Sequence, residues 1–269
     1  MASLKSLFGL IFAKTVVRKN NVWKKNAIFS QHSIFKSLIK KAANTSFGLD
    51  HNFSKITNYS QWKKNVPVRG YEGLSKYIDL IKSGKKNVLW PGKPIYFCKT
   101  SGTTSGIKYI PISKESMPYH IKSARDAMLT YIAETKNTSI INGKMIFIQG
   151  SPSLTKTGEI LTGRLSGIVA HHIPSYLKKN RLPSFKVNCI EDWEEKVDAI
   201  VEETIHEKMS VIGGIPPWVQ MYFEKIKKRS GKKIKDVFPS FNLFIIVFLM
   251  SSSLTLTALD DSLKDFSLP

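Results

Sequence analysis

Residues 94–111 of the chain read Pro94-Ile-Tyr-Phe-Cys-Lys-Thr-Ser-Gly-Thr-Thr-Ser-Gly-Ile-Lys-Tyr-Ile-Pro111. Its two apolar segments, residues 95–98 and 107–110, are expected to form short strands on either side of a loop of serine, threonine and glycine. Gly102 and Gly106 allow the backbone to take positive φ, so several N–H groups can point into one concavity. The stretch therefore predicts a hairpin whose loop can hold an anion.

The side chains of this loop favour a polyphosphate ligand. They supply hydroxyl donors and one mobile positive charge: Ser101, Thr103, Thr104, Ser105 and Lys108. The spacing differs from that of a Walker loop, and the residues after Lys108 favour a strand where a Walker loop opens a helix. Because serine, threonine and glycine are also ordinary turn formers, a hairpin turn without a ligand is the alternative.

Residues 100–111, Thr-Ser-Gly-Thr-Thr-Ser-Gly-Ile-Lys-Tyr-Ile-Pro, resemble the phosphate-binding motif of the auxin-responsive acyl-acid amido synthetases. These enzymes, the Gretchen Hagen family, belong to the adenylate-forming superfamily. Three further motifs are similar to bacterial members: Phe47-Gly-Leu-Asp-His-Asn52, Leu161-Thr-Gly-Arg-Leu-Ser-Gly167 and Gly214-Ile-Pro-Pro-Trp-Val219. The resemblance covers about residues 1–244.

The resemblance implies an α/β fold, a partial large N-terminal domain of the adenylate-forming enzymes. We expect a helical lead-in over residues 1–90 and strand–loop–helix units over 91–244. A non-matching apolar and serine-rich tail follows over 245–269.

The implied chemistry has two half-reactions. A carboxylate attacks the α-phosphate of ATP to give an acyl-adenylate and pyrophosphate, and the amine of an amino acid then displaces AMP to form an amide. The resemblance implies ATP and Mg²⁺ as cofactors, carboxylic acids and amino acids as substrates, and Lys108 as the catalytic residue. The residues expected at the ATP phosphates are Thr100, Ser101, Gly102, Thr103, Thr104, Ser105, Gly106 and Lys108.

Two residues outside the loop are candidates for substrate contact. Arg164 can bind an anion. An ion pair with a carboxylate that stabilises the loop containing Arg164 is the alternative, with equal weight. Trp218 can line the acyl pocket, although any apolar core offers similar residues. The identity of the acid and of the amine acceptor stays open.

We expect no metal site built from protein side chains. His171 and His172 are adjacent, so they cannot share a helix face as i, i+4 zinc ligands do. Cys98 and Cys189 are isolated and have no metal-ligand spacing. Two isolated cysteines also give no disulfide framework, so we expect the reducing environment of the cytoplasm.

The net charge of +21, from 41 Lys+Arg against 20 Asp+Glu, permits a second reading as a basic protein that binds nucleic acid or anionic membrane. The lysines are scattered in pairs, and no nucleic-acid recognition motif accompanies them. The apolar run at residues 7–13 is too short to span a bilayer, so it predicts an amphipathic first helix. We therefore expect a solvated basic surface, with no specific nucleic acid and no membrane as partner.

Periodicity predicts the other elements. Helices are expected at residues 33–43, at 71–83 with Gly84 as cap, at 113–134, at 192–208, and after Pro216 up to Gly231. Strands are expected at 144–149 and 210–213, and a polar turn at 44–52.

The last segment breaks the alternation, because residues 241–250 are continuously apolar. Three interpretations of this segment are open: a buried strand followed by a tail, a short membrane anchor, or a shifted reading frame. We favour a truncated, frame-shifted product, which lacks the family's adenine and ribose motifs and is expected not to complete catalysis alone.

Overall fold

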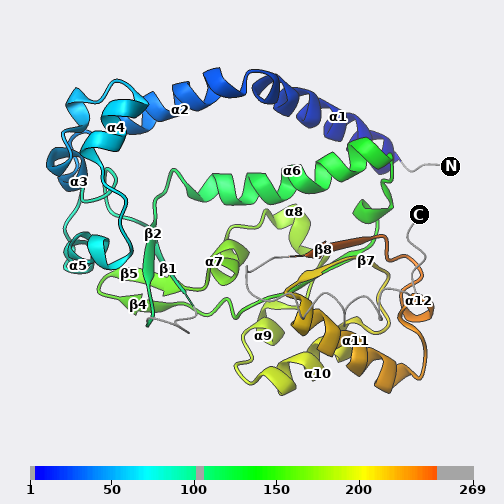
Figure 1. Cartoon of the computed structure of the whole chain (residues 1–269). Coiled ribbons are helices and arrows are strands. Elements are labelled where there is room, and N and C mark those ends of the chain that lie inside the picture. The colour runs from blue at the N-terminus through cyan, green and yellow to red at the C-terminus, as the bar shows by residue number, and fades with distance from the viewer. Residues whose placement is uncertain (1–3, 101–105, 247–269) are drawn as a thin grey trace. The chain divides into compact units, whose positions relative to one another are not determined.

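The structure is a computed structural model that describes residues 4–100 and 106–246 (Figure 1). The chain forms two compact units. We call the first, Met1–Lys14, Ala127–Ser153 and Ala170–Pro269, the parallel-sheet unit, and the second, Thr15–Asp126 and Leu154–Val169, the hairpin unit. Both contain strands and helices, so the α/β class expected from the sequence is confirmed. The domain boundaries at residues 90 and 244 stay predictions.

Helices dominate the chain before residue 90. They are α1 (Leu4–Lys25), α2 (Ala27–Ala42), α3 (Ser46–Asp50), η1 (Phe53–Lys55), α4 (Tyr59–Asn65), η2 (Glu72–Leu74) and α5 (Ser75–Lys82). Gly84 ends α5 as predicted, with φ +92°. The Gly84 N–H donates to the Ile81 carbonyl at 3.0 Å and the Lys85 N–H to the Leu80 carbonyl at 3.0 Å, a Schellman pair.

The polar turn predicted over residues 44–52 is wrong, because the short helix α3 forms there. Its N-cap is Thr45, whose buried hydroxyl accepts from the Gly48 N–H at 3.0 Å and donates to the Ala42 carbonyl at 2.7 Å. A side chain at position 48 would place its Cβ 2.0 Å from that same carbonyl oxygen. Only glycine therefore fits after Phe47 in this motif.

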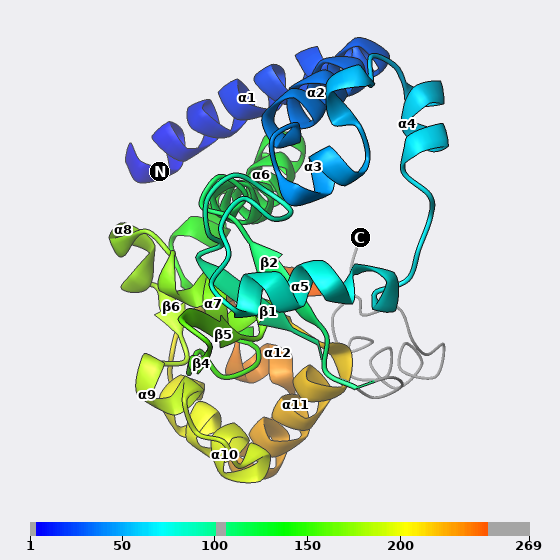
Figure 2. The same ribbon diagram turned by 90° about the vertical axis from the view of Figure 1, so that its left-hand side faces the viewer.

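The hairpin unit contains a four-stranded sheet in the order β2-β1-β5-β4. Its strands are β1 (Tyr96–Lys99), β2 (Tyr109–Ile112), β4 (Thr155–Thr157) and β5 (Ile160–Gly163). β1 runs antiparallel to β2 and parallel to β5, so the predicted hairpin is confirmed. Helix α5 crosses this sheet (Figure 2), and its Tyr77, Ile78 and Ile81 pack with Phe97 of β1 and Ile160 of β5.

The parallel-sheet unit contains a second four-stranded sheet in the order β6-β3-β7-β8, in which every pairing is parallel. Its strands are β3 (Lys144–Ile148), β6 (Arg181–Leu182), β7 (Met209–Gly214) and β8 (Leu243–Ile246). The strands expected near residues 144–149 and 210–213 are thus confirmed. β7 is buried along its full length, which suits a central strand of a parallel sheet.

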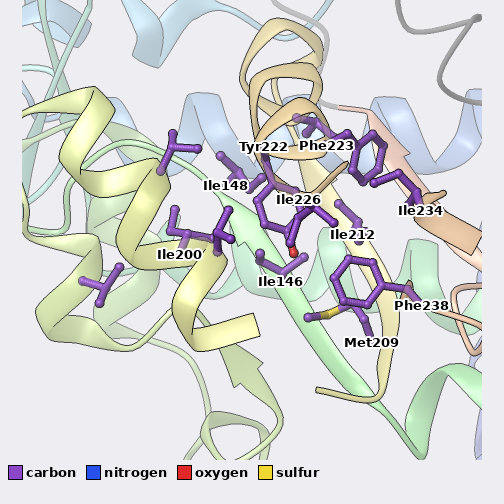
Figure 3. Close-up of a cluster of buried hydrophobic side chains, with 14 residues drawn as sticks. Ile146, Ile148, Ile200, Met209, Ile212, Tyr222, Phe223, Ile226, Ile234 and Phe238 are labelled. Atoms are coloured by element: carbon purple, nitrogen blue, oxygen red, sulfur yellow. The ribbon is translucent and has the colours of Figure 1, made fainter. Parts of the chain in front are cut away.

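Two amphipathic helices, α10 (Trp193–Thr204) and α11 (Pro216–Ser230), cover one face of this sheet. Ile200 of α10 and Tyr222 of α11 point toward Ile146 and Ile212 in one buried cluster (Figure 3). Asp192 caps α10 by accepting from the Glu195 N–H at 2.8 Å. α11 begins at a proline and ends at Gly231 with φ +66°, so the end predicted at this glycine is confirmed.

The remaining helices are α6 (Met117–Thr135), η3 (Ser139–Ile141), α7 (Leu165–His171), α8 (Ser175–Lys178), α9 (Phe185–Asn188) and α12 (Ile234–Val237). α6 begins later than predicted because Ser113 closes a separate turn, accepting from the Ser116 N–H at 3.1 Å. None of the helices in the described residues has the length and apolarity that a bilayer crossing requires. The apolar segment 241–250 contains strand β8, and residues 247–269 of the tail predicted over 245–269 lie outside the described residues.

Candidate functional site

The predicted phosphate loop is closed at its base by Thr100 and Lys108. The Thr100 N–H donates to the Lys108 carbonyl at 3.0 Å, and the Lys108 N–H donates to the Thr100 hydroxyl oxygen at 3.2 Å. Gly106 has φ +79°, so the positive φ predicted there is confirmed. The loop residues between them lie outside the described residues: Ser101, Gly102, Thr103, Thr104 and Ser105. The structure thus defines both ends of the loop.

Tyr71 fixes the Lys108 end of the loop from outside the hairpin. Its hydroxyl oxygen accepts from the Tyr109 N–H at 2.8 Å, and the Lys108 Nζ lies 5.8 Å from the centroid of its ring. Because β2 is an edge strand, the Tyr109 N–H points away from β1 and needs this partner. Tyr71 was not singled out in the sequence, since a tyrosine before a helix carries no chemical signal of its own.

Lys108 differs from Lys82, a lysine of α5 in the same unit. Lys82 forms an ion pair with Asp79 at 3.5 Å, and its Nζ lies 4.4 Å from the centroid of the Tyr109 ring. Lys108, in contrast, makes no ion pair with a carboxylate among the described residues. Its charge is therefore held near an aromatic ring and left available for an anion.

The sheet places Arg164 beside the start of the loop. β5 runs parallel to β1, and its last pairing, Gly163 with Cys98, puts Arg164 at the same carboxyl edge from which the loop leaves β1. This edge is where open α/β sheets usually bind ligands. Arg164 is exposed and forms no ion pair within the described part of the chain, so the loop-holding ion pair is not seen there. Its contact with an anion stays a prediction.

Cys98 lies at the same edge and is half-buried. Burial raises the pKa of its thiol, and a hydrogen bond from the Leu165 backbone opposes that shift. A raised pKa favours the protonated thiol near neutral pH, which lowers the fraction of nucleophilic thiolate. The Leu165 contact also shows that the start of α7 lies directly against the end of β1.

Comparison with known proteins gives the family. Residues 18–186 match the model of the GH3 family N-terminal domain, which is more than half of the chain. The chain belongs to the GH3 family. The resemblance inferred from the loop motif is thus confirmed. A curated relative, the indole-3-acetic acid-amido synthetase GH3.15 of Arabidopsis thaliana, is 33% identical over 93 residues, which are 34% of this chain and 16% of the relative.

Solved structures of GH3 proteins share the fold. A structure described as AtGH3.15 acyl acid amido synthetase in complex with 2,4-DB matches with a TM-score of 0.71 at 15% identity, over 92% of this chain and 53% of that one. A second GH3.15 acyl acid amido synthetase structure matches with a TM-score of 0.57 at 14% identity, over 89% of this chain and 42% of that one. This GH3 chain spans about half the length of these relatives.

Trp218, the second substrate candidate, lies in the parallel-sheet unit, whereas the loop lies in the hairpin unit. Its ring lies 4.5 Å from that of Trp193 at an interplanar angle of 35°, and it packs at the edge of the buried cluster. The Trp193 Nε1–H donates to the Met221 sulfur at 3.1 Å in the same group. These contacts give Trp218 a packing role in this GH3 chain, and its contact with an acyl group stays a prediction.

The histidine pair has structural contacts. The His171 Nε2–H donates to the Pro152 carbonyl at 2.7 Å, and its ring meets Phe185 edge-on at 5.8 Å between centroids. Burial, followed by the charge of His171, lowers the pKa of His172. Within residues 4–100 and 106–246, no group of three or more His, Cys, Asp or Glu side chains could hold a metal ion.

Proposed function

We propose that this GH3 chain binds ATP through the loop between β1 and β2, as the phosphate-binding part of an acyl-acid amido synthetase. The observation that carries the proposal is the closed base of the loop, in which Thr100 and Lys108 bond to each other and Lys108 pairs with no described carboxylate. The loop leaves the carboxyl edge of β1, beside Arg164, and this supports a ligand site there.

The donor set fits the phosphates of ATP. Backbone N–H groups, hydroxyls and one ammonium group would hold them: Thr100, Ser101, Gly102, Thr103, Thr104, Ser105, Gly106 and Lys108. Arg164 supplies a second cation at the same edge. Because no described carboxylate cluster would bind Mg²⁺ by itself, we propose that the ion is held largely through phosphate oxygens, as is usual for Mg²⁺ at nucleotides.

In the proposed reaction a carboxylate oxygen forms a bond to the α-phosphorus, and the bond to the bridging oxygen breaks, releasing pyrophosphate. Lys108 acts on the leaving group, where its positive charge offsets the charge that accumulates on pyrophosphate. The hydroxyls of the loop hold the phosphates in line for the attack. In the second half-reaction an amino acid amine attacks the acyl carbon, AMP leaves, and an amide forms.

The remaining parts of the proposal follow from the family. Substrates are a carboxylic acid and an amino acid, with Trp218 in the acyl pocket, and the setting is the cytoplasm, where the free thiols Cys98 and Cys189 stay reduced. We also propose that the helical part ends near residue 90 and the family-like part near 244. We further propose that residues 1–269 bind ATP without completing amide synthesis alone.

Direct binding of ATP to the purified chain, with and without Mg²⁺, tests the loop assignment. Lys108→Ala should weaken binding about 10- to 100-fold, because a hydrogen bond to a charged group contributes about 1.5–3 kcal/mol. The matched control is Lys156→Ala, which removes an exposed lysine of β4 in the same unit. Equal affinity in the Lys108 variant and the parent would refute the loop assignment.

ATP–pyrophosphate exchange over a panel of carboxylic acids tests the chemistry separately. We expect ATP binding without robust exchange. Acid-dependent exchange by the parent chain that is lost in Lys108→Ala would support adenylation and contradict our expectation of no robust exchange. Formation of the amide by the same chain would refute the claim that it does not complete catalysis alone. Absence of ATP binding would refute the proposed function as a whole.

A further inference from the structure

The first helix exposes a continuous apolar face. Its members recur at i, i+3, i+4, i+7 and i+8, the spacing of one helix face, and each has between 50% and 70% of its surface exposed: Leu4, Leu7, Phe8, Ile11 and Phe12. We call these five residues the apolar face of α1. Single exposed apolar residues are ordinary on protein surfaces, but a contiguous set of this size usually marks an interaction site.

The opposite side of α1 over residues 4–14 packs within the parallel-sheet unit, to which these residues belong. Ser6 and Ala13 are buried, and a Cβ at Gly9 would lie 2.6 Å from the Ile141 side chain. The Lys5 Nζ donates to the Ile141 carbonyl at 2.6 Å, and the Asn142 side chain donates to the Ser6 hydroxyl at 3.1 Å. These contacts fix the rotation of the helix about its axis, so the apolar face points outward.

The charge around this face has one sign. The first acidic residue of the chain is Asp50, and the preceding 49 residues carry nine basic ones: Lys5, Lys14, Arg18, Lys19, Lys24, Lys25, Lys36, Lys40 and Lys41. Arg18 and Lys19 fall on the same side of α1 as the apolar face, about two turns beyond Phe12. None of the nine forms an ion pair with a carboxylate in the described part of the chain.

We propose that α1 docks this protein on an anionic lipid surface, lying in the plane of the membrane. The apolar face would enter the boundary between headgroups and acyl chains, and Lys14, Arg18 and Lys19 would extend to the lipid phosphates. The proposal does not depend on ATP binding. It replaces the expectation of no membrane partner, which rested on the short apolar run and could not include the exposure of the face.

The chemistry of the face selects this partner over two others. Nucleic acid would attract the cations, but five large apolar side chains would gain nothing against a phosphate backbone. A protein partner that covered the apolar face would also have to desolvate Arg18 and Lys19 or supply matching acids. An anionic membrane surface accepts both at once, because its apolar layer lies directly below a layer of negative charge.

The test is cosedimentation of the full 269-residue chain with phosphatidylcholine vesicles that contain or lack phosphatidylserine. We expect binding that requires phosphatidylserine and weakens as salt is raised. Leu7→Ser with Phe8→Ser should reduce the partition coefficient about tenfold or more, since both side chains would leave the lipid. The matched control is Val68→Ser with Phe185→Ser, two residues that are just as exposed elsewhere.

A second pair of variants tests the charges. Arg18→Ala with Lys19→Ala should reduce binding about tenfold or more, whereas Lys156→Ala with Lys186→Ala, which removes the same charge elsewhere, should reduce it less. Circular dichroism should show parent-like helix content in all four double variants, because every changed side chain is exposed.

Three results would overturn the proposal. The parent chain could remain in the supernatant with anionic vesicles, or the Leu7→Ser, Phe8→Ser variant could bind them as well as the parent does. Alternatively, the parent chain could bind no vesicles but self-associate in a concentration-dependent way, and the Leu7→Ser, Phe8→Ser variant could lose that self-association. The apolar face of α1 would then belong to a dimer interface.

Discussion

Tyr71→Phe tests how the base of the loop is held. The substitution keeps the ring near the Lys108 Nζ and removes only the hydroxyl oxygen that accepts from the Tyr109 N–H at 2.8 Å. β2 is an edge strand, and Lys108 already uses both its N–H and its carbonyl toward Thr100. The Tyr109 N–H therefore faces away from β1 and depends on Tyr71.

The expected magnitude follows from that single bond. A hydrogen bond of this kind contributes about 1 kcal/mol net, so local opening of β2 should become about fivefold more frequent. Hydrogen–deuterium exchange at the Tyr109 amide measures this directly, and we expect exchange about fivefold faster in Tyr71→Phe. The ring stays in place, so ATP affinity should change much less than in Lys108→Ala.

Tyr119→Phe is the control, because it removes a hydroxyl from an exposed tyrosine of the same unit. Exchange at Tyr109 should be unchanged in that variant. If Tyr71→Phe and the parent exchange at the same rate, the hydroxyl does not hold the edge strand, and our account of the loop base is wrong.

Two further predictions concern one contact in each unit. Thr45→Ala removes the cap of α3 and should lower the free energy of unfolding by about 1–2 kcal/mol, measured by urea denaturation. Thr45→Ser keeps the hydroxyl and should recover most of this loss. Full stability of the alanine variant would contradict the capping role. Tyr222 is buried, and its hydroxyl oxygen lies 2.8 Å from the Thr204 hydroxyl oxygen. Burial raises the pKa of its phenol well above the ordinary value of 10.0. Because the folded state keeps this proton longer than the unfolded state does, its contribution to stability is present below about pH 10 and is lost as the pH rises further. The melting temperature, measured from neutral to strongly alkaline pH, should therefore fall less steeply in Tyr222→Phe than in the parent. Identical slopes of melting temperature against pH would contradict the prediction.

Much of the local structure was determined by the sequence. Apolar periodicity located α10, the prolines after Ile215 located the start of α11, and the glycines at positions 84 and 231 predicted where α5 and α11 end. Alternation of glycine and hydroxyl residues between apolar segments was sufficient to predict the hairpin and the positive φ of Gly106. These features depend on short-range sterics and hydrogen bonds, which neighbouring residues specify.

Two other features were not predicted from the sequence. The polar composition of residues 44–52 concealed α3, although its Thr45 cap contacts only Ala42 and Gly48, each three residues away. A tyrosine with no motif around it gave no reason to select Tyr71, whose role depends on a strand 38 residues away. The Tyr71 contact forms only when the chain is folded, whereas the Thr45 cap is a local contact that polar composition alone did not reveal.

The phosphate loop shows the same division. Its residue types and its membership of the GH3 family were readable from the sequence, because glycine, hydroxyl and lysine side chains carry their chemistry wherever they are placed. The tertiary structure decided what surrounds the loop, since only the parallel pairing of β1 with β5 brings Arg164 to its edge. The structure likewise decided which side of α1 is covered. The sequence predicts an amphipathic helix there, and only packing against Ile141 determines that Leu7 and Phe8 remain outside.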